Sequence, residues 1–73
     1  MCGIIAYIGQ RDACPILVEG LKRLDYRGYD SAGLVVIREG RLRLRRAVGR
    51  IAALERRLDD ELYGAGIGMA HTR

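Results

Sequence analysis

The sequence has little with which to build an aromatic core, because its 73 residues include no tryptophan, no phenylalanine and only four tyrosines. Leucine, isoleucine and valine must therefore supply most of the buried volume. A domain of this length buries only about 60% of the surface that its unfolded chain exposes. The sequence thus predicts one small domain at most, spanning residues 1–73, with a marginal core.

Cysteine is scarce too, since Cys2 and Cys14 are the only two. Small secreted domains that depend on disulfides carry more cysteines than this. We therefore expect a reducing compartment, the cytoplasm. Together with His71, the only histidine, these cysteines lack the spacing of a zinc site, so we expect no metal and no cofactor.

Long hydrophobic runs are absent as well. No apolar stretch approaches the roughly 20 residues that a membrane-spanning helix needs. The apolar N-terminal run is not preceded by the charged region of a secretory signal. We expect no membrane partner.

Hydrophobic alternation and spacing predict two elements in the first half of the chain. Residues 2–9 are apolar on both alternating faces, which is typical of a strand covered on both sides. Residues 13–24 follow as an amphipathic helix, with Asp12 as a plausible cap and Pro15 in the first turn. The apolar face of this helix is formed by Leu17, Leu21 and Leu24.

A hairpin is predicted next. Residues 33–38 are rich in β-branched side chains, as a strand requires. Glu39 and Gly40 form a two-residue turn into residues 41–45, whose strict alternation is typical of a half-exposed strand. We expect a hairpin with one face in solvent.

The last third of the sequence predicts one helix and one strand. Apolar residues at helical spacing begin at Ile51, and the helix is expected to end near Gly64. Residues 67–73 are typical of a strand with small residues on one face, against which something packs closely. The order of elements favours antiparallel sheets and helices in layers, an α+β fold.

Basic charge is concentrated around the hairpin. The net charge is +4, and residues 38–50 hold six arginines against Glu39 alone. Such a segment can attract an anionic partner. No aromatic side chains alternate with these arginines, as base stacking would require, so a solvated edge strand is favoured and no nucleic-acid partner is expected. A small basic module that binds anions or nucleic acid remains an alternative.

Cys2 stands directly behind the initiator methionine. If Met1 is removed, one residue carries both a thiol and a free α-amino group, whose ordinary pKa values are about 8.5 and about 7.7 to 8.0. Such an amine can take the proton from a neighbouring nucleophile, directly or through one water. Cys2 is therefore a candidate catalytic residue, and the alternative is a small buried side chain.

Three motifs in register make the whole chain similar to a known family. They are Met1-Cys2-Gly3-Ile4, Tyr26-Arg27-Gly28-Tyr29-Asp30-Ser31-Ala32-Gly33 and Gly68-Met69-Ala70-His71-Thr72-Arg73. In this order and spacing they resemble the glutaminase domain of class II glutamine amidotransferases. The second motif resembles the group that passes ammonia from glutamine to fructose 6-phosphate and makes glucosamine 6-phosphate. Amidophosphoribosyltransferases and asparagine synthetases tend to have His-Arg-Gly at its start.

The resemblance implies an N-terminal nucleophile hydrolase fold, an αββα sandwich of two antiparallel sheets between helices. It implies that Cys2 attacks the side-chain amide of L-glutamine to form a γ-glutamyl thioester, with its own α-amino group as the base. Mapped by motif, Arg73 would bind the α-carboxylate of glutamine, a task suited to a planar, charged fork. Arg27 and Gly28 would lie beside the nucleophile, and the Gly28 backbone would help to hold the substrate or the terminal amine.

Several of these residues also have a purely structural interpretation. Arg27 would then anchor its loop by hydrogen bonds to carbonyls. Gly28 and Gly33 would only supply backbone angles closed to other residues. His71 is expected to be packed and hydrogen-bonded and not catalytic, because the family uses the terminal amine as its base.

The resemblance further implies that the chain is an N-terminal fragment. Family members continue past Arg73 with further substrate-binding residues and a sugar isomerase domain that receives the ammonia. The parent enzyme would act on L-glutamine and fructose 6-phosphate and form a homodimer, whereas the fragment alone would be inactive. Another class II amidotransferase, of the amidophosphoribosyltransferase or asparagine synthetase type, remains an alternative.

Overall fold

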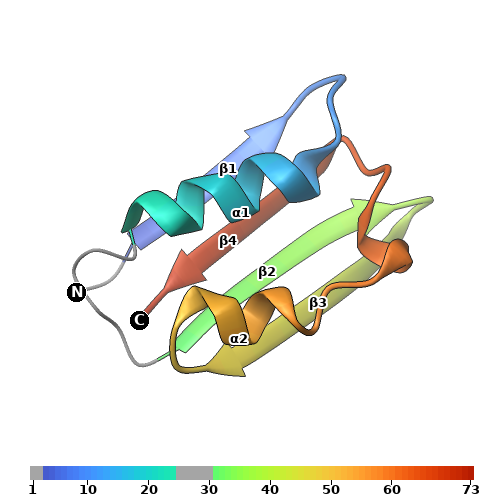
Figure 1. Ribbon diagram of the computed structural model, residues 1–73. Helices are drawn as coiled ribbons and strands as arrows, with labels where there is room; N and C mark the ends of the chain where they lie inside the picture. Colours follow the sequence, from blue (N-terminus) through green and yellow to red (C-terminus); the bar gives the residue numbers. More distant parts are fainter. Residues whose placement is uncertain (1–2, 25–30) are drawn as a thin grey trace.

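One antiparallel sheet carries both helices on the same face (Figure 1). The computed structural model describes residues 3–24 and 31–73. Cys2, Arg27 and Gly28, which the sequence singles out, lie outside these described residues. For the described residues, the predicted α+β arrangement of antiparallel strands and helices in layers is confirmed.

Four strands, two α-helices and a short 3-10 helix are present in the described residues. Along the sheet the strand order is β1, β4, β2, β3, so the last strand of the chain lies between the first two. Helix α1 packs on β1 and β4, and α2 packs on β3 and β2 (Figure 1). The bounds are β1 Gly3–Ile8, α1 Ala13–Leu24, β2 Ser31–Arg38, β3 Arg41–Val48, α2 Ile51–Glu55, the 3-10 helix η2 Asp60–Leu62 and β4 Ile67–Thr72.

Helix α1 has the bounds that the sequence predicts. Asp12 caps it, because its Oδ1 accepts a hydrogen bond from the Cys14 backbone N–H at 3.4 Å. Lys22 and Arg23 lie in the last turn, where the helix dipole favours positive charge. The buried side chains of the helix are all apolar and are those of Ala13, Cys14, Leu17, Val18 and Leu21.

The hydrophobic core lies between the sheet and the helices. Leu17 of α1 and Leu34 and Val36 of β2 are almost completely buried in it, and Leu62 extends it to η2. Full burial of a side chain of this size contributes about 1.5–3 kcal/mol to stability. Neither helix in residues 3–24 and 31–73 is long and apolar enough to span a membrane.

Small residues on β4 let α1 approach the sheet closely, as the sequence predicts. A Cβ added at Gly68 would lie 2.9 Å from Leu17 Cδ1 and 2.7 Å from the carbonyl oxygen of Val35. Carbon atoms in favourable contact are about 3.5–4.0 Å apart. Position 68 therefore has no room for a side chain.

We expect Gly68→Ala to lower the free energy of unfolding by about 1–3 kcal/mol, the usual cost of overpacking a filled core. The Val35 oxygen belongs to the backbone of a central strand and cannot move aside cheaply. Urea unfolding followed by circular dichroism measures the loss. Gly20→Ala is the matched control, because its methyl group would meet only the side chain of Ile5, nearest at its terminal Cδ1, and no backbone atom, and because alanine favours the helix. An equal loss in both variants would contradict the packing argument.

The turn between β2 and β3 is the two-residue turn that the sequence predicts. Glu39 and Gly40 have φ of 54° and 76°, and Arg38 pairs with Arg41 across them. Two successive residues with positive φ match the right-handed twist of the strands that they join. Glycine adopts such an angle without strain, which explains Gly40.

Strand β3 turns Arg43 and Arg45 toward the helices and its two leucines away from them. Arg45 Nη2 lies 2.9 Å from Asp59 Oδ2 and 3.2 Å from Glu61 Oε1. Arg43 Nη1 lies 3.8 Å from the second oxygen of Glu61. On the opposite face, Leu42 is 70% exposed. The predicted edge strand is confirmed, but two of its arginines are paired with carboxylates and its leucines face outward.

The single second helix predicted from Ile51 onward is wrong, because the chain breaks it into α2 and η2. Asp59 separates the two with an extended backbone, and its side chain accepts a hydrogen bond from the Glu61 N–H at 3.0 Å. Short polar side chains that bond to nearby backbone N–H groups start turns more readily than they continue a helix. The predicted apolar positions still reach the core, since Ile51, Leu54 and Leu62 are buried and Leu58 packs against them.

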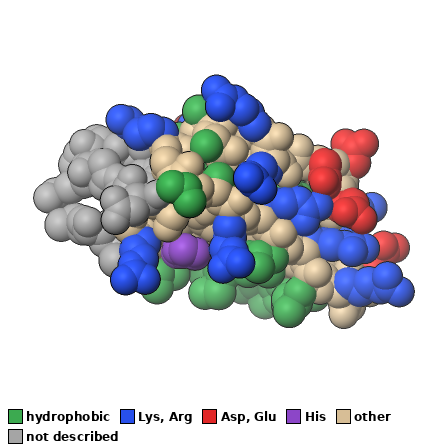
Figure 2. Space-filling model, turned by 90° about the horizontal axis from the view of Figure 1, so that it is seen from below, with side chains coloured by type: hydrophobic (Ala, Val, Ile, Leu, Met, Phe, Trp, Pro, Cys, Tyr) green, Lys and Arg blue, Asp and Glu red, His purple; other side chains and the backbone are tan. Residues whose placement is uncertain are grey.

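The face of the sheet without helices, here called the open face, is hydrophobic and exposed. Figure 2 shows hydrophobic side chains gathered along this side of the molecule. Ile4 and Ile8 of β1 are 73% and 76% exposed, whereas Ile5 and Tyr7 on the other face pack against the core. The expectation that β1 is covered on both faces is therefore wrong for the described residues. The apolar side chains of the open face are Ile4, Ala6, Ile8, Val35, Ile37, Leu42, Leu44, Val48, Ile67 and Met69.

Candidate functional site

The described residues of the three sequence motifs meet at one end of the sheet. Strand β1 begins at Gly3, the residue after Cys2 in the sequence, and Gly3 lies opposite Thr72. Strand β2 begins at Ser31, whose backbone pairs with that of Arg73. These positions are far apart in the sequence and become neighbours because β4 lies between β1 and β2 (Figure 1). This end of the sheet is the candidate functional site.

Arg73 is the one predicted site residue within the described part of the chain. Its backbone N–H donates to the Ser31 carbonyl oxygen at 2.9 Å, and the Ser31 N–H donates to the Arg73 carbonyl oxygen at 3.2 Å. The residue is exposed. The backbone of Arg73 is thus fixed by the sheet, while its guanidinium is accessible to a ligand. The roles of Cys2, Arg27 and Gly28 stay predictions.

Gly33, the last residue of the second motif, provides space between two strands. It pairs with His71 of β4 on one side and with Arg46 of β3 on the other. A Cβ at Gly33 would lie 2.6 Å from His71 Nε2 and 3.2 Å from Arg46 Cγ. Its φ is not in the left-handed region. The interpretation that Gly33 supplies a special backbone angle is therefore wrong. Glycine is needed here because a side chain would collide with His71 and Arg46.

His71 is exposed on the open face. It packs over Gly33, as described above, and no hydrogen bond joins its side chain to another described residue. The expectation of a packed, hydrogen-bonded histidine is therefore wrong within the described residues, because His71 is exposed and its side chain has no hydrogen bond there.

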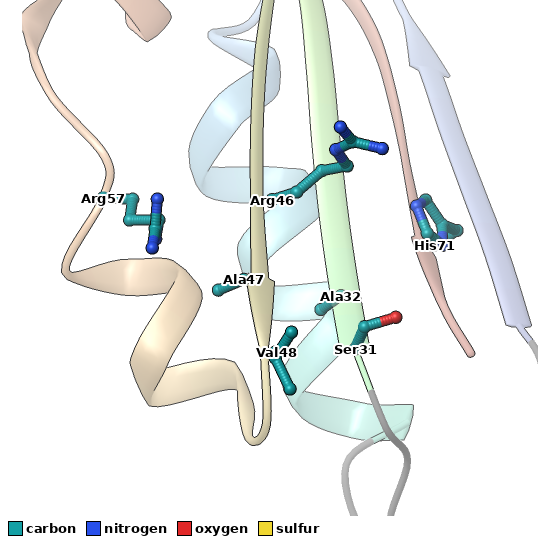
Figure 3. Close-up of a pocket in the computed structure, with 7 residues that line it drawn as sticks. All are labelled: Ser31, Ala32, Arg46, Ala47, Val48, Arg57 and His71. Atoms are coloured by element: carbon teal, nitrogen blue, oxygen red, sulfur yellow. The ribbon is translucent and has the colours of Figure 1, made fainter.

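A groove of about 350 Å³, here called the basic groove, opens at the same end of the sheet (Figure 3). Figure 3 shows Arg46 extending across β2 toward His71, with Arg57 on the other side of β3. The sequence did not single out Arg46, Arg57 or Ser31 as site residues. The available signal was the cluster of arginines, but their grouping with His71 follows only from the strand order. The groove is lined by Ser31, Ala32, Arg46, Ala47, Val48, Arg57 and His71.

The second cysteine is poorly suited to nucleophilic chemistry. Cys14 is completely buried and is a free thiol. Burial raises its pKa, the nearby Asp12 carboxylate raises it further, and a hydrogen bond with Tyr63 opposes both effects. A buried thiol that stays protonated is inert, because the thiolate is the nucleophile. Within residues 3–24 and 31–73 no three histidine, cysteine, aspartate or glutamate side chains are grouped to hold a metal.

Arginines at the hairpin end of β2 and β3 are held by the segment around η2. The hydrogen bond from Arg45 lowers the pKa of Asp59 and raises the pKa of Arg45 itself. Arg38 Nη1 donates to the carbonyl oxygens of Asp60 and Glu61 at 3.3 and 3.4 Å. Much of the basic charge predicted around the hairpin is therefore engaged by carboxylates and carbonyl oxygens of the chain itself.

Comparison with known proteins gives matches over the whole chain. The chain is 52% identical to the glutamine–fructose-6-phosphate aminotransferases (isomerizing) of Clostridium tetani and Shewanella oneidensis, and 51% identical to that of Mesorhizobium japonicum. Each match covers 100% of this chain and 12% of the relative, so the chain spans a small part of their length. No family model matches the chain. The resemblance carried by the three motifs is confirmed, and it extends over all 73 residues.

Proposed function

We propose, from this similarity to glutamine–fructose-6-phosphate aminotransferases, that the chain is the N-terminal part of the glutaminase domain of such an enzyme. The observation that carries the proposal is 52% identity over all 73 residues. Because the chain spans 12% of the length of its relatives, the activity is assigned to the full-length protein. That protein hydrolyses L-glutamine and passes the ammonia to fructose 6-phosphate, which gives glucosamine 6-phosphate.

In the proposed reaction Cys2, freed of Met1, is both nucleophile and base. The thiol proton passes to the α-amino group, and the sulfur bonds to the amide carbon of the glutamine side chain. The carbon–nitrogen bond then breaks, and the amino group returns the proton to the nitrogen, which leaves as ammonia. Water attacks the remaining thioester, which yields glutamate and restores the thiol.

The proposed role of Arg73 is to bind the α-carboxylate of glutamine through two parallel hydrogen bonds. Support comes from its exposed side chain on a backbone fixed by Ser31. Arg27 and Gly28 are proposed to lie beside the nucleophile. The described neighbours of these motifs share one sheet end, since Gly3 lies opposite Thr72 and Ser31 pairs with Arg73. A nucleophile and a carboxylate clamp must be this close to act on one small amino acid.

The proposed fold of the complete domain is the αββα sandwich of the N-terminal nucleophile hydrolases. Support comes from the open face, where apolar side chains of all four strands form rows across the sheet. Contiguous apolar patches on a protein surface mark places where another element packs. A second sheet would stack on this one at about 10 Å. We further propose a homodimer in the cytoplasm, where the free thiol of Cys14 is stable.

A direct experiment is to incubate the full-length protein with L-glutamine and fructose 6-phosphate and to measure glutamate and glucosamine 6-phosphate. We expect the two products in equal amounts, because each ammonia released is transferred. Glutamine hydrolysis with a different acceptor would favour another class II amidotransferase. Absence of glutamine hydrolysis would refute the proposal and would favour the alternative function, a basic module that binds anions.

A further inference from the structure

Ser31 and Arg73 stand side by side on the open face, at the functional end of the sheet. Their backbones exchange two hydrogen bonds, of 2.9 and 3.2 Å. Strand residues that exchange both bonds lie directly opposite each other, with side chains on the same face and Cβ atoms about 4.5–5.5 Å apart. Arg73 follows Met69 and His71 in the alternation of β4, which places its side chain on the open face. The Ser31 side chain therefore stands beside it there.

The hydroxyl of Ser31 is accessible and has no partner within the described residues. No hydrogen bond joins its side chain to another residue in this part of the chain. Figure 3 shows the Ser31 oxygen on the side of β2 where β4 lies, the strand that Arg73 follows. Ser31 is half-buried and lines the basic groove. A small ligand held by Arg73 can therefore reach this hydroxyl.

The neighbours of this pair on the open face leave both side chains available for a ligand. Val48, opposite Ser31 on β3, is apolar and cannot donate a hydrogen bond. Gly33 has no side chain, and the His71 ring packs over it. No carboxylate of the described residues forms an ion pair with Arg73. Within that part of the chain, Ser31 is thus the donor that lies directly opposite Arg73 in the sheet.

We propose that Ser31 is a further substrate-binding residue, whose hydroxyl donates a hydrogen bond to the α-carboxylate of glutamine beside Arg73. The proposal rests on the function proposed above. An arginine fork takes one acceptor site on each carboxylate oxygen, and an ionised carboxylate offers about four such sites, so sites remain for a hydroxyl. The proposed second sheet would cover the open face, and a hydroxyl removed from water needs a hydrogen-bond partner. The substrate carboxylate supplies that partner.

The test is steady-state glutaminase kinetics of the full-length protein with Ser31→Val and Ser31→Thr. The two new side chains are both β-branched and similar in shape, but only threonine keeps a hydroxyl. We expect Ser31→Val to raise KM for glutamine about tenfold, because one hydrogen bond to a charged group is lost. Its kcat should change less than about twofold, because the carboxylate is bound alike in the ground state and the transition state. Ser31→Thr should keep KM within about threefold of the wild-type value, because its hydroxyl can make the same bond.

A double-mutant cycle tests whether Ser31 and Arg73 bind the same carboxylate. In the Arg73→Ala background the carboxylate is no longer held beside Ser31. Adding Ser31→Ala there should lower kcat/KM for glutamine by less than about threefold, compared with about tenfold when Arg73 is intact, because residues that share a partner are not additive. Independent losses that simply multiply would place the hydroxyl away from the carboxylate and overturn the proposal.

Two further results would overturn the proposal. One is an unchanged KM in Ser31→Val, and the other is an equal rise in KM in Ser31→Val and Ser31→Thr, which would mean that shape and not the hydroxyl matters. Circular dichroism checks that the variants fold, and Ser31→Ala replaces Ser31→Val if the valine variant does not. A wild-type protein that hydrolyses glutamine while these variants fail the test would refute the role of Ser31 alone. A wild-type protein without glutaminase activity would refute the proposed function and the role of Ser31 with it.

Discussion

Replacing Cys2 with alanine in the full-length protein is expected to abolish glutamine-dependent synthesis of glucosamine 6-phosphate, with a loss of at least about 10⁴-fold in kcat. When the catalytic nucleophile is removed, the enzyme keeps only the rate enhancement that comes from substrate binding and from stabilisation of charge in the transition state. The measurement is the rate of glutamate and glucosamine 6-phosphate formation at saturating glutamine. The effect is this large because one residue is proposed to provide both the attacking sulfur and the base.

The matched control for this experiment is Cys14→Ala, which removes the other sulfur. Cys14 is completely buried, and its pKa is raised by that burial. We therefore expect lower stability, by the cost of a small cavity, but a nearly unchanged turnover for the folded enzyme. Glutamine-driven turnover that survives in Cys2→Ala would remove the basis of the proposed chemistry. Full activity of a mature protein that keeps Met1 would do the same.

The second large effect is expected for Arg73. Arg73→Ala should lower kcat/KM for glutamine by about 100-fold or more, because a bidentate charge-assisted pair with the α-carboxylate contributes more than a single hydrogen bond of about 1.5–3 kcal/mol. Arg73→Lys keeps the charge but loses the planar fork, so it should recover only part of the loss. Steady-state kinetics at varied glutamine concentration measure kcat/KM for both variants.

The fold should tolerate these changes at position 73. The contacts that fix Arg73 run through its backbone to Ser31 and do not depend on the side chain. Arg41→Ala, at the opposite end of the sheet, provides a control for the loss of one exposed arginine. An unchanged KM for glutamine in Arg73→Ala would exclude the proposed binding of the glutamine α-carboxylate by Arg73. The proposed role of Cys2 as nucleophile would not be affected.

Local patterns predicted the described elements well where neighbours in sequence decide the structure. The helix at residues 13–24 follows from its leucine spacing and the Asp12 cap, and the turn follows from Glu39 and Gly40. The second helix was predicted wrongly because a leucine repeat cannot reveal that Asp59 caps a separate turn and pairs with Arg45, a residue 14 positions away. A long-range ion pair and a local cap together decided that break.

Residues of the candidate site were predicted to different extents. Arg73 was found from its motif, and the structure describes it at the sheet end. Cys2, Arg27 and Gly28 rest on the sequence alone, because they lie outside the described residues. Arg46 and Arg57 could not be assigned to a groove from the sequence, because the sequence predicted the hairpin of β2 and β3 but not that β4, with His71, lies on the other side of β2. The spacing of charges along a strand does not identify its partner.

The sequence by itself determined the four strands, the helix at residues 13–24 and the hairpin turn, and which family the three motifs resemble. Those features depend on the spacing of apolar side chains, on capping residues and on the conformational freedom of glycine, all of which act over a few positions. The tertiary structure alone decided that β4 lies between β1 and β2, that Arg43 and Arg45 face the helices, and that one apolar face of the sheet stays open. The physical reason is that strand pairing and burial are settled by contacts between residues distant in the chain, which no local pattern contains.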